Sequence, residues 1–263
     1  MAALKYAVPR RPTFGSGITP ASQALACTET RGRFARGFTL TEMAVVLVIV
    51  ALLIAGMMLP LSAQQDIRAR QESEQTLNDI RDALYGFAIA NGRLPRPATS
   101  ATNGAENPAT CADDAACSGF VPWATLGVRK LDGWNKLIRY SVTPAYANAA
   151  ITLATVANRT VQTRDAGAAP YLAGQAACST ANQCVPAVIF SHGKNNWGTS
   201  ETGAALPDSS ATNVDEDANN TGPTSYFSRL PGTDATGGEF DDVVVWLPTT
   251  ILFNRLITAG KLP

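Results

Sequence analysis

The chain has 263 residues, of which 46% are apolar and 16% are charged. This apolar fraction excludes a disordered chain, and the length allows one or two domains. Because the 21 basic and 21 acidic side chains cancel, a strongly basic nucleic-acid-binding protein is disfavoured, although a local basic patch remains open. The charges are unevenly placed. Residues 1–37 hold six basic groups and one acidic group, whereas residues 38–263 hold 15 basic and 20 acidic groups.

Residues 43–61 form a run of nineteen residues without a charge. As a helix this run spans about 28 Å, close to the ~30 Å hydrocarbon core of a bilayer, so we expect a transmembrane segment. The alternatives are a buried core helix, which is rarely so uniformly apolar, and a cleaved secretory signal, which needs a shorter run. Arg31, Arg33 and Arg36 precede the run, which predicts a cytoplasmic N-terminus and an exported body.

The polar sequence after the apolar run is also typical of a helix. One face repeats every three or four positions, and we expect it to be buried: Ser73, Leu77, Ile80, Leu84 and Phe87. Asn91 and Gly92 are suited to a helix end. We therefore predict a single helix from about residue 40 to residue 90, with a membrane half followed by an amphipathic half.

The junction before the apolar run reads GFTLTE, from Gly37 to Glu42. A carboxylate at a membrane boundary costs free energy unless it is paired, so Glu42 is a candidate functional residue. This junction and the helix that follows resemble the N-terminus of type IV prepilins and type II secretion pseudopilins.

The resemblance implies that a prepilin peptidase cuts between Gly37 and Phe38 and methylates the new amine of Phe38. It implies that Glu42 assists methylation or pairs with the Phe38 amine of a neighbouring subunit. The alternative is an interfacial glutamate solvated by headgroups. The basic leader, residues 1–37, is long for this family, and we expect it to be removed. The implied partners are the peptidase, other pilin or pseudopilin subunits, the assembly platform of the bacterial inner membrane and membrane lipid.

Four cysteines lie in the predicted exported body, in two similar segments. Their spacing favours the disulfides Cys111–Cys117 and Cys178–Cys184, although four cysteines allow three pairings. A zinc site is disfavoured because its cysteine pairs are usually separated by two to four residues and these are separated by five.

The body, residues 92–263, begins with a long loop over residues 92–122. Short apolar runs at 137–142, 151–156, 186–190 and 243–247 predict strands, and residues 249–259 predict a final helix. A long helix followed by short strands predicts an α+β fold, with a small antiparallel sheet packed on the amphipathic half of the helix.

The body also resembles the pseudopilins, in DGWNKLIRY, SHGKNNWG and FDDVVVW. In the major pseudopilins a C-terminal loop binds calcium, and calcium prefers carboxylate and carbonyl oxygens. If this chain binds calcium, the candidate ligands are Asp215, Asp217, Asp241 and Asp242. The alternative is a solvated acidic loop.

The motifs of the common enzyme classes are missing from the sequence, so we do not expect an enzyme. The first hypothesis is a structural filament subunit, either a pseudopilin or a minor pilin. It would be stored in the inner membrane and assembled through its apolar helix into a pilus or a periplasmic secretion filament. The second hypothesis is a tip adhesin or binding module that uses the loop at residues 199–238. The acidity of that loop makes nucleic acid an unlikely ligand.

Overall fold

The computed structural model describes residues 37–165, 167 and 169–262, and leaves the side chains of residues 56–61 undescribed. The predicted leader therefore lies outside the described residues, apart from Gly37. The chain divides into two compact units, Met1–Leu52 and Leu53–Pro263, and each is described by itself.

Helix α1, Leu40–Asn91, matches the predicted long helix within one residue. In the first unit every described side chain from Gly37 to Leu52 is exposed. In the part of the chain that the structure describes, no helix is both long and apolar enough to count as a membrane span. The predicted span, residues 43–61, includes six residues whose side chains lie outside that part, and it stays a prediction.

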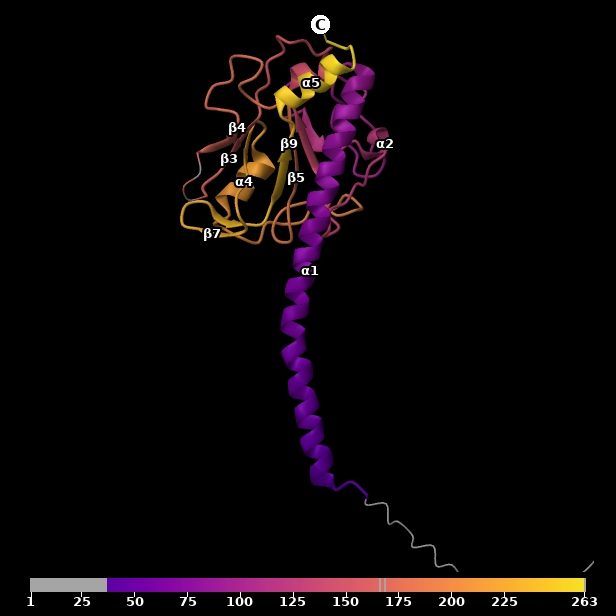
Figure 1. Ribbon diagram of the computed structural model, residues 1–263, viewed down its shortest axis with the longest axis vertical. Coiled ribbons are helices and arrows are strands. Elements are labelled where there is room, and N and C mark those ends of the chain that lie inside the picture. Colours follow the sequence, from indigo (N-terminus) through magenta and orange to yellow (C-terminus); the bar gives the residue numbers. More distant parts are fainter. Residues whose placement is uncertain (1–36, 166, 168, 263) are drawn as a thin grey trace, which may run out of the picture. The chain divides into compact units, whose positions relative to one another are not determined.

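The second unit is built on a four-stranded antiparallel sheet with the strand order β1-β2-β5-β9 (Figure 1). Its strands are Ser118–Phe120 (β1), Arg139–Val142 (β2), Ala187–Ser191 (β5) and Val243–Trp246 (β9). A second sheet has the order β4-β3-β6, and β7 pairs with β8. These strands are Thr160–Gln162 (β3), Tyr171–Ala173 (β4), Ser225–Phe227 (β6), Gly232–Asp234 (β7) and Gly238–Phe240 (β8). The remaining helices are Trp123–Leu126 (α2), Pro144–Asn148 (α3), Val214–Thr221 (α4) and Thr249–Thr258 (α5).

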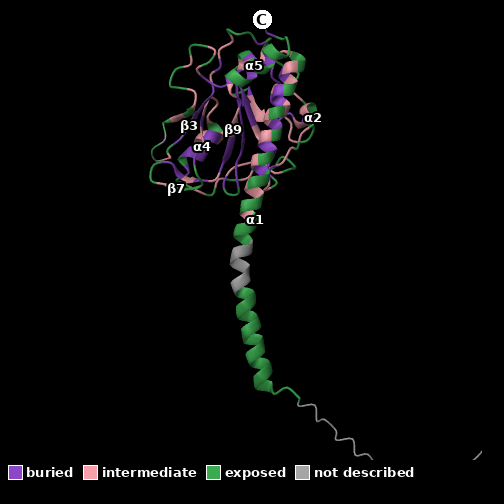
Figure 2. Cartoon of the chain, in the orientation of Figure 1, coloured by how far each residue is buried: buried purple, intermediate pink, exposed green. Residues whose placement is uncertain are grey.

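Strand β5 is covered on both faces, and all five of its residues are buried (Figure 2). Side chains alternate across a strand, so Ala187 and Ile189 join the core formed with α1 and α5, whereas Val188 and Phe190 join a second core with β3 and β6. Burial on both faces explains why this strand is continuously apolar in sequence instead of alternating.

The structure confirms the predicted α+β class, with a long N-terminal helix packed on a four-stranded antiparallel sheet. The predicted buried face of α1 is largely confirmed, because Ser73, Leu77, Ile80 and Leu84 are fully buried. Phe87 is half-buried, and the Arg93 guanidinium lies over its ring. The strand expected at residues 151–156 is wrong. This segment forms a turn in which Thr155 Oγ1 accepts from the Thr152 backbone N–H, and the Thr155 carbonyl accepts from Tyr146 Oη.

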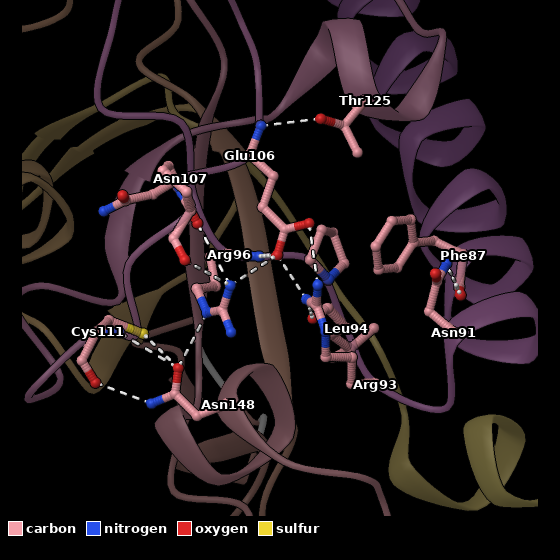
Figure 3. Close-up of polar contacts among 12 residues, drawn as sticks. Phe87, Asn91, Arg93, Leu94, Arg96, Glu106, Asn107, Cys111, Thr125 and Asn148 are labelled. Carbon is pink, nitrogen blue, oxygen red and sulfur yellow. Dashed lines mark hydrogen bonds and ion pairs between the residues drawn. The ribbon is translucent and has the colours of Figure 1, made fainter.

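The segment at residues 92–122, predicted to be a loop, contains strand β1, and it is held by more than its disulfide (Figure 3). The Glu106 carboxylate pairs with Arg93 and Arg96. The Asn148 side chain bonds both main-chain groups of Cys111, donating to its carbonyl at 2.9 Å and accepting from its N–H at 3.2 Å. The two disulfides are Cys111–Cys117 and Cys178–Cys184, the pairing that the spacing favours.

The turn after residue 131 approaches the α1 backbone closely. The Gly133 N–H donates to Ser73 Oγ at 2.9 Å, and Ser73 Oγ donates to the Ala69 carbonyl. A methyl group on Gly133 would overlap that carbonyl oxygen. This contact therefore requires glycine.

We predict that Gly133→Ala lowers the free energy of unfolding by about 1–3 kcal/mol, because a rigid backbone contact cannot accommodate the added methyl group. Gly86→Ala is the matched control. Gly86 is an exposed position inside α1 with open space around it, so alanine there should stabilise by about 0.5–1 kcal/mol. Denaturant unfolding of the full chain measures both, and equal stability of the two variants would contradict the predicted close contact.

Candidate functional site

The Gly37–Phe38 peptide bond lies in non-helical chain directly before α1. Both residues are exposed, Phe38 with 78% of its surface accessible, and nothing lies within 4 Å of a Cβ placed on Gly37. A peptidase requires an accessible, non-helical bond, and this bond meets both conditions.

Glu42 and Thr39 form a capping box at the start of α1. Glu42 Oε2 accepts from the Thr39 backbone N–H at 2.8 Å, and Thr39 Oγ1 accepts from the Glu42 backbone N–H at 3.2 Å. This reciprocal pair satisfies donors that an uncapped helix end leaves open. Glu42 therefore stabilises its own helix in the isolated subunit.

The four predicted calcium ligands do not form one group. Asp215 is fully buried and pairs with Arg164 at 2.8 Å and Arg229 at 2.9 Å. Asp217 accepts from Trp197 Nε1 at 2.8 Å. Both side chains are therefore engaged elsewhere.

Asp241 and Asp242 do come together, and their third partner is Glu216, which the sequence analysis missed. One carboxylate oxygen from each of these three residues lies within 4.8 Å of the others. Glu216 is on α4, a helix in the segment that was expected to be a loop. Successive side chains on a helix point about 100° apart, which is why Glu216 reaches the cluster and its sequence neighbours do not.

Most oxygens of this cluster already accept hydrogen bonds. Glu216 Oε1 accepts from the Asp241 N–H, and Glu216 Oε2 accepts from two asparagine amides. Asp241 Oδ2 accepts from two backbone N–H groups, and Asp242 Oδ2 accepts from the Asn219 amide. The remaining oxygens are Asp241 Oδ1, which has no hydrogen-bond partner among the described residues, and Asp242 Oδ1, which lies 3.7 Å from His192 Nδ1.

A buried lysine supplies a cation at this cluster. Lys136 Nζ donates to the main-chain carbonyls of His192, Asn195 and Asn196 at 3.2, 2.7 and 2.8 Å. Burial lowers the pKa of Lys136, while the carboxylates around it, Asp241 and Asp132 foremost, raise it. The ammonium therefore uses the carbonyl oxygens that a calcium ion would need, and it repels a second cation.

The donor set fits calcium poorly, because four of its six carboxylate oxygens already accept from N–H donors and the carbonyls beside it accept from Lys136. The three carboxylates of Glu216, Asp241 and Asp242 lie close together, but closeness with so few free oxygens is not enough to hold calcium. Sequence reasoning missed Lys136, although its place in DGWNK, shortly after Asp132, was a usable signal.

We predict that neither calcium nor a chelator shifts the thermal unfolding midpoint of the full chain. Lys136→Met should lower the free energy of unfolding by about 3 kcal/mol or more, because it leaves buried carboxylates and carbonyls without their cation. A midpoint that rises with calcium and falls with chelator in the unaltered chain would contradict this assignment.

Asp241 in the same cluster makes the free energy of unfolding depend on pH. Burial raises the pKa of Asp241 to about 7, from an ordinary value of 3.8. Between these values the folded state binds the proton more tightly than the unfolded state, so stability falls as pH rises from 4 to 7. Asp241→Asn should reduce the loss of stability between pH 5 and pH 8. Urea unfolding at the two pH values measures this, and an unchanged pH dependence would contradict it.

Comparison with known proteins yields one family match. The family described as the prokaryotic N-terminal methylation motif matches residues 32–58. The chain therefore carries a type IV prepilin-like signal, and its mixed α+β architecture is consistent with a pilin-like fold. No curated protein and no solved structure matches the chain.

Proposed function

We propose that the chain is a structural subunit, a pseudopilin or minor pilin, of a type IV pilus or a type II secretion filament. The observation that carries this is the methylation motif, together with the exposed Gly37–Phe38 bond directly before a 52-residue helix. A prepilin peptidase removes residues 1–37 and methylates the Phe38 amine.

Before assembly the subunit sits in the bacterial inner membrane through residues 43–61, with its body, residues 92–263, on the far side. The uncharged segment and the basic residues before it support this topology. The exposed apolar side chains of the first unit support the next step, because an apolar surface this continuous marks a contact with lipid or with other subunits. The assembly platform then transfers these helices from lipid into the filament core.

Glu42 joins neighbouring subunits in this proposal. Its Oε2 caps its own helix, and no hydrogen bond to its Oε1 is found among the described residues. The free oxygen is suited to the cationic Phe38 amine of a neighbour, since a carboxylate removed from water requires a cation.

Intact mass of the chain purified from membranes of a host with active prepilin peptidase tests the processing. We expect a chain that begins at Phe38, heavier by one methyl group, and lighter by four hydrogens before reduction. Gly37→Val should keep the leader, and its open surroundings exclude a folding defect as the cause. An unaltered chain that keeps its leader would contradict the proposal.

Glu42→Gln tests the assembly role separately from the capping role. Glutamine preserves a capping box but removes the charge. We expect the leader to be cleaved as usual and incorporation into filaments to fall at least tenfold. Normal incorporation would show that Glu42 only caps its helix. Thr39→Ala, which weakens the cap and keeps the charge, is the matched control.

A further inference from the structure

Arg139 on β2 is partly buried, and within residues 37–165, 167 and 169–262 it has no carboxylate partner. Its Nε atom is buried and has no hydrogen bond, and its guanidinium lies 5.3 Å from the Phe120 ring centroid. Two other buried arginines differ in this respect, since Arg159 pairs with Asp114 and Arg229 with Asp215. A guanidinium withdrawn from water costs free energy unless an anion compensates it.

Arg139 lines a cavity of about 140 Å³. The cavity lies between strands β1, β2 and β5 and the C-terminal end of α4. Ser118, Asn220 and Tyr226 are among the other lining residues. This volume is large enough for water molecules or for a carboxylate with one or two carbon atoms.

The neighbouring groups favour a singly charged ligand. Asp114 precedes Ala115, which lines the cavity, but its carboxylate is engaged by Arg159 at 2.7 Å and by Asn158 at 3.0 Å, so it does not neutralise Arg139. The C-terminal end of α4 contributes partial negative charge, which opposes any anion and opposes a doubly charged phosphate more than a singly charged carboxylate. A carboxylate matches the planar fork of a guanidinium and carries only one charge.

We propose that this cavity binds a carboxylate group, held by the Arg139 guanidinium. The carboxylate comes either from a small molecule or from an acidic side chain of a second copy of the chain. The site is independent of the N-terminal motif, so its failure would leave the filament proposal intact.

Acetate is the probe, added to the full chain in detergent micelles at an ionic strength held constant with sodium chloride. We expect acetate to raise the unfolding midpoint of the unaltered chain, because a ligand that binds the folded state stabilises it. Arg139→Gln should weaken acetate binding by about tenfold or more. Arg68→Gln is the matched control, since Arg68 is exposed on α1 and its loss should leave the effect unchanged.

Two further measurements keep the test decisive if Arg139→Gln folds poorly. In the unaltered chain labelled with ¹⁵N-arginine, the Arg139 Nε–H resonance, assigned by its loss in Arg139→Lys, should shift on addition of acetate. If a second copy supplies the carboxylate, acetate should also dissociate dimers seen by sedimentation. If neither the midpoint nor the resonance responds to acetate, the proposal is overturned, and dimers that resist acetate exclude the second copy as the source.

Discussion

The burial of one face of α1 against the main sheet constrains the rest of the second unit. Leu77, Ile80 and Leu84 have no exposed surface and form one core with β2, β5, β9 and α5. At about 25 cal/mol per Å² of apolar surface removed from water, such a face outweighs single polar contacts. The turn that carries Gly133 must therefore fit the helix backbone, and the chain that follows it is positioned by that fit.

The second constraint is the polar link between two turns at one end of the sheet. Asp132 accepts from the backbone N–H groups of Trp134 and Lys136 and from Ser191 Oγ. Lys136 then extends its ammonium to the carbonyls after β5. A side-chain cation is part of the chain, so the turn it holds is complete as soon as the chain folds.

Periodicity in the sequence identified the elements whose burial is simple. The helix from residue 40 and the strands near residues 139, 187 and 243 all have an apolar pattern that matches their structure. The segment at residues 151–156 is equally apolar but forms a turn, because its polar groups are satisfied locally. Helix α4 was missed because its acidic residues carry no apolar period, and their contacts to Arg164 and Arg229 depend on residues distant in sequence. The methylation motif, by contrast, is one contiguous stretch of sequence, so it can be recognised without knowledge of the fold.

Strand β1 affects whether the main sheet can pair with a strand of another molecule. It is an edge of the main sheet and has only three residues. The backbone N–H and carbonyl of Phe120 are already paired with Ala98. Long exposed edges with unpaired backbone groups recruit strands from other molecules. Because this edge is short and partly paired already, it is poorly suited to pair with a strand of another molecule.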